Sequence, residues 1–186
     1  MLAEHLGGHL NKTHLDHGAL DWLVKEFHIK SFLDIGCGPG GMVELAEKSG
    51  LNALGIDGDH TLERYNPQRF IIHDYTKGIV ELDRKFDLAW SVEFLEHVEE
   101  QYMPNYMHSF QYAKHAVVTY APPGTNGHHH VNLQEEDYWL DKFAQYGFMI
   151  NQDATRTLRQ VSTMNVPKKI RKAFIYNRGL FLTNEN

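Results

Sequence analysis

The stretch FLDIGCGPGG, at residues 32–41, decides which fold class this chain belongs to. Three of its first four residues are apolar and favour strands, namely Phe32, Leu33 and Ile35. Glycines follow at positions 36, 38, 40 and 41, and only a glycine-rich backbone can follow so tight a turn. Residues 42–48 then place apolar side chains along one face of a helix. The stretch therefore predicts a buried strand, a glycine turn and a helix, which together bring backbone N–H groups close to a bound ligand.

The spacing of the glycines fits two kinds of nucleotide-binding turn. Gly36, Gly38 and Gly41 match the dinucleotide pattern G-x-G-x-x-G, which is a weak signal by itself. Asp34 makes the pattern sharper, because it lies inside the strand two residues before Gly36. With this acid and glycines at the alternate positions 36, 38 and 40, the stretch resembles motif I of class I S-adenosylmethionine-dependent methyltransferases.

An acidic residue at the end of the next apolar run supports the same interpretation. Residues 52–57 end in Asp57, which lies 21 positions after Gly36. A carboxylate at this place can accept two hydrogen bonds from a ribose diol, and its charge makes these bonds stronger than neutral ones. Dehydrogenases use the same arrangement, so Asp57 alone does not separate the two families.

Two further runs extend the resemblance along the chain. Residues 70–72 are apolar and are followed by Asp74 and Tyr75. In the methyltransferase family an acid here meets the adenine amino group, and its neighbour contacts the ring. Residues 86–98, FDLAWSVEFLEHV, resemble the segment after the fourth strand in the small-molecule branch of the family. The resemblance covers residues 30–120 well and the rest of the chain in outline.

The resemblance implies S-adenosylmethionine as the cofactor and a specific set of residues that bind it. The expected cofactor-binding residues are Asp34, Gly36, Cys37, Gly38, Gly40, Asp57, Gly58, Asp74, Tyr75, Ser91 and Glu93. Within this set, Cys37 is expected to pack as a small residue in the turn and not to act as a nucleophile. It is the only cysteine, so the chain forms no internal disulfide, which fits a reducing cytosol and predicts a cytoplasmic location.

The other apolar runs predict an α/β fold. Helices are expected at residues 20–27, at 98–113 with a fresh start around Pro104, and at 134–146, with a short helical turn at 61–65. Strands are expected at 115–121, 148–150 and 180–182, with basic helices before the last strand. Alternation of strands and helices implies a parallel sheet wound on both faces. The resemblance adds an antiparallel hairpin at one edge, with the ligand at the carboxyl ends of strands one, two and four. We expect a Rossmann-like, doubly wound, mostly parallel seven-stranded sheet with helices on both faces.

We expect a single domain over residues 1–186, and composition and charge bound its class. With 42% hydrophobic residues, the chain has enough apolar side chain for one core. No apolar run is long enough for a transmembrane helix, and the first residues lack the features of a secretory signal. The net charge is −6, which makes nucleic acid an unfavourable partner.

The charge is unevenly distributed, because a basic segment, residues 155–178, is expected as an insertion near the end of the core. From residue 155 onward there are seven basic residues and one acid. Such a tail can bind an anion. However, Val166, Ile170 and Phe174 recur at helical spacing, which favours a solvated amphipathic helix over an anion site.

Two regions outside the cofactor core are expected to decide the substrate. Residues 1–30 should form a lid and a helix: the polar stretch 5–18 contains Gly7 and Gly8, which would let it move over the cofactor, and Thr13 is a candidate cap for the helix. The second region, residues 122–132, follows the fifth strand and carries three consecutive histidines, whose usual pKa suits proton transfer near neutral pH.

The histidines also raise the question of a metal. In an extended loop His128 and His130 point one way and His129 the other, so at most two can chelate together. A complete site would need outside donors such as Glu93 or His97, and His97 is expected to be a packing residue. We therefore expect no metal and take His128, His130 and Glu93 as the catalytic candidates.

These observations predict a methyltransferase that acts on a small molecule or a soluble glycan, at oxygen in preference to nitrogen. The Asn/Asp-Pro-Pro-aromatic motif of DNA amino-methyltransferases is absent, since residues 91–94 read SVEF. A non-catalytic module that binds S-adenosylmethionine would keep every motif. A nicotinamide-dependent oxidoreductase would share the glycines but leave Asp34 and the Glu93 segment unexplained. We expect a monomer or homodimer with no membrane partner.

Overall fold

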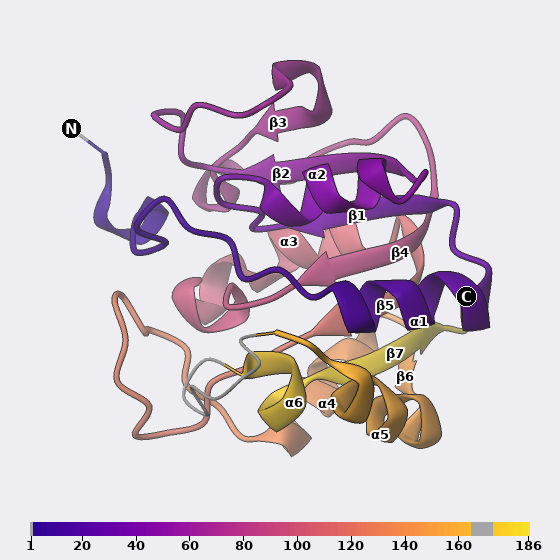
Figure 1. The fold of residues 1–186 in the computed structure, drawn as a ribbon. Coiled ribbons are helices and arrows are strands. Elements are labelled where there is room, and N and C mark those ends of the chain that lie inside the picture. The colour runs from indigo at the N-terminus through magenta and orange to yellow at the C-terminus, as the bar shows by residue number, and fades with distance from the viewer. Residues whose placement is uncertain (1, 165–172) are drawn as a thin grey trace.

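The computed structural model describes residues 2–164 and 173–186, which form one domain around a seven-stranded sheet (Figure 1). The strands are β1 (Ser31–Ile35), β2 (Asn52–Asp57), β3 (Phe70–Ile72), β4 (Phe86–Ser91), β5 (Ala113–Val118), β6 (Phe148–Ile150) and β7 (Leu180–Asn184). Their order in the sheet is β3-β2-β1-β4-β5-β7-β6. The first five strands are parallel, and β7 runs antiparallel to both β5 and β6. The predicted Rossmann-like sheet with an antiparallel edge is confirmed.

Helices cover both faces of the sheet, as predicted. The α-helices are α1 (His17–Phe27), α2 (Gly41–Lys48), α3 (Met103–Phe110), α4 (Glu136–Gln145), α5 (Gln152–Val161) and α6 (Phe174–Arg178). One core cluster joins the sheet to α3 and α4 through Phe110 and Phe143, and the other joins it to α1, α2 and α5. Alternate residues of β1 serve the two clusters, Leu33 the first and Phe32 the second, because successive side chains of a strand point to opposite faces.

Short 3-10 turns connect several of these elements. They are η1 (Glu4–Leu6), η2 (Pro67–Arg69), η3 (Tyr75–Lys77), η4 (Leu95–His97) and η5 (Glu100–Tyr102). The helical turn predicted at residues 61–65 is absent from the structure. A turn forms later, at η2, where Asn66 caps the N-terminus and Pro67 occupies the first position. Proline therefore begins the turn here and does not limit one, since its missing N–H is not needed at a helix start.

Two other predicted elements differ at their ends. The helix expected over residues 98–113 is divided into η5 and α3, and α3 ends at Phe110 because β5 already begins at Ala113. The cap of α1 is Asp16 and not Thr13: its Oδ1 accepts a hydrogen bond from the Ala19 N–H at 2.9 Å. Asp16 is fully buried and also accepts a bond from the Thr163 N–H at 2.8 Å, so it ties the start of α1 to the residues after α5.

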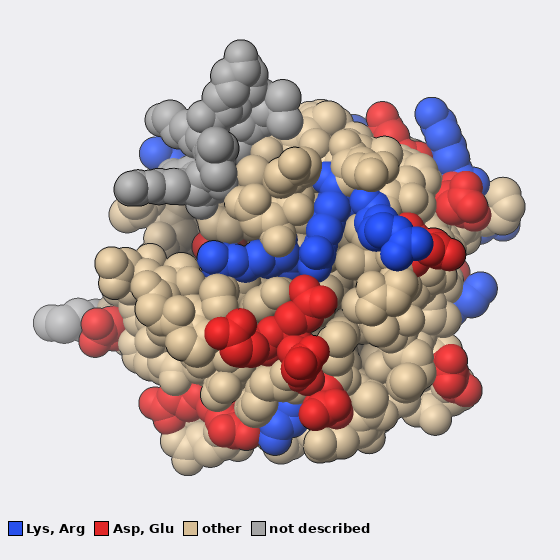
Figure 2. Space-filling view, turned by 90° about the horizontal axis from the view of Figure 1, so that it is seen from below, with Lys and Arg blue, Asp and Glu red and all other residues tan. Residues whose placement is uncertain are grey.

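The basic tail is partly neutralised by acids where it is described. The guanidinium of Arg159 lies 3.0 Å from the Glu136 carboxylate, and Arg156 pairs with Asp153. Figure 2 views the side that carries α4, α5 and α6 and shows basic side chains directly beside acidic ones. The predicted helix through Val166 and Ile170, with its basic residues at 168, 169, 171 and 172, lies outside the described residues. None of the described helices is long and apolar enough to span a membrane.

Candidate active site

The glycine turn between β1 and α2 has the backbone that only glycine adopts readily. Gly36, Gly38 and Gly40 have φ angles of 76°, 52° and 86°, in the left-handed region. At Gly36 a side chain is also excluded by its surroundings, because a Cβ atom there would lie 2.1 Å from the ring of Phe94. The Gly36 N–H donates to the carbonyl oxygen of Ile56 at 2.9 Å, which fixes the turn to β2.

Two adjoining cavities lie at the carboxyl ends of β1, β2 and β4. The larger has a volume of about 800 Å³ and the smaller about 300 Å³, and both are lined by Asp57, Gly58 and Phe94. The predicted residues that line the larger cavity are Asp34, Gly36, Cys37, Gly38, Asp57, Gly58, Glu93, His128 and His130. The predicted residues that line the smaller one are Asp57, Gly58, Asp74 and Tyr75.

Two of the predicted cofactor residues line neither cavity. Gly40 lies behind the turn, where a Cβ atom would meet the ring of Phe70 at 2.4 Å. The hydroxyl of Ser91 donates to the carbonyl oxygen of Ile35 at 2.8 Å and so joins β4 to β1. Both residues therefore hold the strands and the turn in position from outside the cavities.

Two buried aspartates face the larger cavity near the turn. The Asp57 carboxylate accepts bonds from the N–H groups of Gly38 and Asp59, each at 2.8 Å, and from the guanidinium of Arg64 at 3.3 Å. Burial raises the pKa of Asp57, although these donors oppose the effect. Burial and then the charge of Asp57 raise the pKa of Asp34 well above its usual value. The pair gives this end of the cavity an acidic lining with affinity for cationic or hydroxyl groups.

The smaller cavity is bounded by Asp74 and Tyr75, the residues expected at the adenine. Oδ1 of Asp74 accepts bonds from the Thr76 N–H at 2.9 Å and lies 3.1 Å from Nε2 of His5. Tyr75 is buried, and its hydroxyl donates to Ser109 on α3 at 2.9 Å. The aromatic ring of Tyr75 packs edge-on against Phe94, so a rigid aromatic wall separates this cavity from the core.

The N-terminal segment, residues 4–14, lies across both cavities, at the strand ends that Figure 1 shows as arrowheads. Nε2 of His9 lies 2.9 Å from Oδ2 of Asp59, and Thr13 accepts a bond from the Gly41 N–H at 3.0 Å. Leu6 packs over Gly58, where a Cβ atom would lie 2.3 Å from it. The polar contacts of His9 and Thr13 and the apolar side chain of Leu6 therefore hold the N-terminal segment over the cavities.

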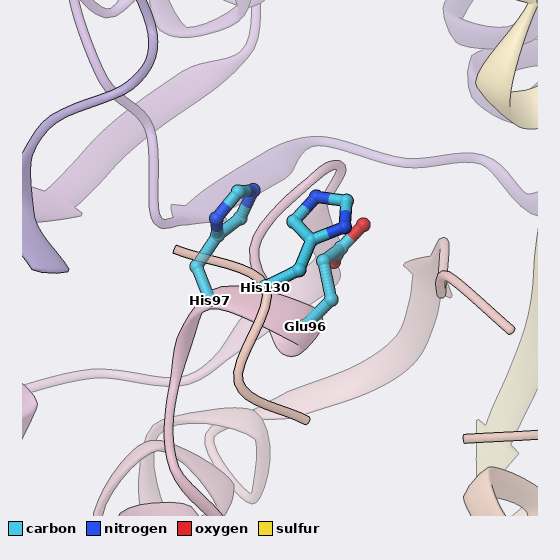
Figure 3. Close-up of side chains that lie close together, drawn as sticks. All are labelled: Glu96, His97 and His130. Atoms are coloured by element: carbon cyan, nitrogen blue, oxygen red, sulfur yellow. The ribbon is translucent and has the colours of Figure 1, made fainter. Parts of the chain in front are cut away.

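The far end of the larger cavity is built from the segment after β4 and the loop after β5. Glu93 has a left-handed φ of 56°, which is rare for residues other than glycine, and its N–H donates to Thr119 at 2.9 Å. The carbonyl oxygen of Glu96 accepts bonds from the N–H groups of Val131 and Asn132 at 2.9 and 3.1 Å. These bonds bring His130 beside Glu96 and His97, as Figure 3 shows.

The ionisable groups at this end have shifted pKa values, because they are buried and lie close together. Burial, and then the mutual repulsion of the two acids, raises the pKa of Glu93, and burial raises the pKa of Glu96. Arg178 opposes both shifts. Burial and then His130 lower the pKa of His97 to about 4, so its ring is neutral at physiological pH. The rings of His97 and His130 are 4.9 Å apart and nearly perpendicular.

The three consecutive histidines do not alternate as an extended loop would require. His129 has a left-handed φ of 47°, which breaks the extended backbone. His128 therefore turns to the N-terminal segment, where Nε2 lies 2.9 Å from the carbonyl oxygen of Glu4, and His129 lies near His5. Only His130 joins Glu96 and His97. The expectation that His128 and His130 share a direction was wrong.

Sequence reasoning did not select Glu96, the most deeply buried acid of this site. Its exposed fraction is 0%, and it lies three positions after Glu93 within the segment that carries the family resemblance. The signal in the sequence that could have identified Glu96 is an acid within the otherwise apolar residues that precede His97. His97, expected to be a packing residue, also lines both cavities.

With this geometry established, comparison with known proteins identifies the family. A family model described as a methyltransferase domain matches residues 13–156, which is more than half of the chain. The chain belongs to this methyltransferase family. The resemblance to class I S-adenosylmethionine-dependent methyltransferases is thereby confirmed. No curated protein matches this methyltransferase significantly.

Solved structures of low sequence identity share the fold of this methyltransferase. A TehB-like methyltransferase from Corynebacterium glutamicum is 17% identical, with a TM-score of 0.63 over 91% of this chain and 89% of that one. Magnesium protoporphyrin IX methyltransferase from Synechocystis is 18% identical, with a TM-score of 0.60 over 89% and 76%. A 1,6-didemethyltoxoflavin-N1-methyltransferase from Burkholderia thailandensis is 14% identical, with a TM-score of 0.58 over 90% and 76%.

Proposed function

We propose that this methyltransferase transfers a methyl group from S-adenosylmethionine to an oxygen atom of a small molecule or soluble glycan. The observation that carries the proposal is the continuous cavity that runs from the glycine turn and its two aspartates to Glu93, His97 and His130, with Glu96 buried next to them. Bound S-adenosylmethionine supplies a methyl group on a positively charged sulfur, so the protein has to align the acceptor with it. Alignment alone can contribute about 7–11 kcal/mol to lowering the barrier.

The residues at the turn fit this cofactor by their chemistry. The buried carboxylate of Asp34 suits the cationic amino group of the methionine part, and Asp57 suits the ribose diol. Asp74 and Tyr75 bound a cavity of about 300 Å³, which suits the adenine ring. Gly58 lines both cavities, and a Cβ atom there would lie 2.3 Å from Leu6 of the covering N-terminal segment.

The opposite end of the cavity suits a hydroxyl acceptor. A hydroxyl has to lose its proton during transfer, and the groups lining this end that can take part are His130 and Glu93. Nε2 of His128 instead lies at hydrogen-bond distance from the carbonyl oxygen of Glu4. We propose that His128 helps to hold the N-terminal segment as a lid and that His130 acts at the acceptor.

The size of the site supports a small acceptor. The cavity of about 800 Å³ has to accommodate part of the cofactor as well as the substrate, and residues 4–14 cover it. The structural neighbours include methyltransferases named for small molecules, such as magnesium protoporphyrin IX and 1,6-didemethyltoxoflavin. The net charge of −6 and the single cysteine support a cytoplasmic protein that does not act on nucleic acid.

Calorimetric titration with S-adenosylmethionine and with NAD tests the cofactor. We expect saturable binding of the first and none of the second, and the opposite result would favour an oxidoreductase. A transfer screen with labelled S-adenosylmethionine then tests the reaction on hydroxylated small molecules, soluble glycans, amines and carboxylates. Binding without transfer to any class would favour the non-catalytic module. Sedimentation of the same sample distinguishes a monomer from a homodimer.

A further inference from the structure

Three side chains at the acceptor end are close enough to share one ion. A carboxylate oxygen of Glu96 and one ring nitrogen each of His97 and His130 all lie within 4.8 Å of one another. Figure 3 shows the two imidazole rings side by side, with the Glu96 carboxylate next to the ring of His130. Ligand atoms at about 2.1 Å from a common ion lie roughly 3–4 Å apart, so small rotations of these side chains would complete the arrangement.

The polar atoms of this cluster lack partners that their burial requires. Glu96 is fully buried, and apart from the neighbouring carboxyl group of Glu93 neither of its carboxylate oxygens has a hydrogen-bond partner among residues 2–164 and 173–186. Nδ1 of His97 is also buried without a partner in that part of the chain. An unsatisfied buried group destabilises the fold, and a charged one does so more. A bound cation would satisfy the carboxylate and would use the lone pair of a neutral imidazole.

The surroundings of His130 resemble those of a histidine that ligates a metal. Its Nδ1 lies 3.0 Å from the carbonyl oxygen of Thr125, which requires the proton on Nδ1 and leaves the lone pair on Nε2. Ligating histidines usually donate their other N–H to a carboxylate or a backbone carbonyl in this way. Gly127 leaves the space for the ring, since a Cβ atom there would lie 2.1 Å from Nε2.

The backbone holds the cluster in place before any ligand arrives. Glu96 and His97 belong to η4, and the Glu96 carbonyl oxygen accepts bonds from Val131 and Asn132, which directly follow His130. The two segments are therefore joined at the cluster itself. Glu93 adds a second acid beside Glu96, while Arg178 is the described basic side chain that acts on both.

We propose that Glu96, His97 and His130 bind one divalent metal ion. Two imidazoles and one carboxylate form a donor set that suits Zn²⁺, Co²⁺, Fe²⁺ and Mn²⁺ better than Ca²⁺ or Mg²⁺. Three protein ligands leave at least one coordination position free, and two of the three, His97 and His130, line the larger cavity. If the proposed methyl transfer is correct, an acceptor hydroxyl bound there would have its pKa lowered by the ion. The binding of the metal does not depend on that function.

The experiment is calorimetric titration of metal-free, cofactor-free protein with Co²⁺, Zn²⁺ and Mn²⁺ separately. We expect one ion of at least one of these metals per chain and a loss of affinity of roughly 10-fold or more in both Glu96→Gln and His130→Ala. The matched control is His128→Ala, which removes a histidine two positions away and should keep the wild-type affinity. Because neither S-adenosylmethionine nor an acceptor is present, a failure of the proposed methyl transfer would not affect this result.

A second measurement covers the case of a variant that does not fold. The visible absorption of wild-type protein titrated with Co²⁺ should develop ligand-field bands that saturate at one equivalent, and X-ray absorption should find two imidazoles on the metal. No saturable binding of any of the three metals, or equal losses in His128→Ala and His130→Ala, would overturn the proposal. A metal coordinated without imidazole would overturn it as well.

Discussion

The acids at the two ends of the cavity differ in whether N–H groups donate hydrogen bonds to their carboxylates. At the cofactor end, Asp57 accepts hydrogen bonds from two backbone N–H groups and from Arg64. At the proposed acceptor end, Glu96 is buried more deeply, yet its carboxylate has no N–H donor among the described residues and lies beside a second acid, Glu93. Nearly all buried polar groups in proteins are satisfied, so an exception needs a reason. The proposed metal ion would supply that reason.

The difference follows from how each end is assembled. The cofactor end comes from β1, β2 and the glycine turn between β1 and α2, so its geometry is set by short-range backbone structure. The acceptor end joins η4 to the loop after β5, which are separated by more than 30 residues along the chain. A site assembled from distant segments can change its chemistry without a change in the sheet, because loops tolerate substitution better than the strands they connect.

The largest expected effect tests the acceptor end. His130→Ala should lower turnover by roughly 10²-fold or more, because it removes either a proton acceptor or a metal ligand at the acceptor. The affinity for S-adenosylmethionine should be nearly unchanged. The matched variant His128→Ala should keep most of the turnover. Steady-state kinetics together with calorimetry provide both values. Equal losses of turnover in the two variants would contradict the prediction that His130, and not His128, acts at the acceptor.

The next effect tests the cofactor end. Asp57→Ala should weaken S-adenosylmethionine binding by more than tenfold, because charge-assisted hydrogen bonds contribute about 1.5–3 kcal/mol. Calorimetry measures the change, and circular dichroism checks that the fold is retained. Asp141→Ala, on the exposed side of α4, is the control and should bind as wild type. Unchanged affinity in Asp57→Ala would exclude this residue from the cofactor site.

A smaller effect is expected from the N-terminal segment that spans both ends. If it closes over the cofactor, trypsin should cut after the exposed Lys12 in free protein, and S-adenosylhomocysteine should slow this cleavage severalfold. Cleavage after Lys85, in the loop before β4, serves as the internal control and should not depend on ligand. Equal rates at Lys12 with and without ligand would mean that the segment does not act as a lid.

The smallest effect compares acids with and without partners. Glu96→Gln should raise the melting temperature of the metal-free protein at pH 8, because it removes a buried charge that lies beside a second acid, Glu93, and that no described N–H group stabilises by a hydrogen bond. A gain of about 1 kcal/mol corresponds to about 2–4 °C for a protein of this size. Glu136→Gln should show no gain, since that carboxylate already pairs with Arg159 and Tyr120. Scanning calorimetry decides, and a lower melting temperature for Glu96→Gln would contradict the prediction.

Local sequence predicted the glycine turn and the acid that ends β2, and the reason is physical. Gly36 and Gly38 stand where the backbone has a positive φ, and Asp57 ends a strand whose apolar pattern marks it as buried. The same reasoning was wrong for residues 61–65, where no helical turn forms, and for the cap of α1, where Asp16 replaces Thr13. In the second case the deciding contact is with Thr163, which is distant in the sequence.

The sequence by itself determined the strand–turn–helix unit and the family, because these depend on short-range periodicity and on backbone angles that few residues adopt. The tertiary structure alone decided that Glu96, His97 and His130 meet and that His128 leaves them for Glu4. The left-handed φ of His129 and two hydrogen bonds to the Glu96 carbonyl oxygen fix where these histidines lie. Local sequence patterns predict neither feature, because each depends on the position of a distant segment of the chain.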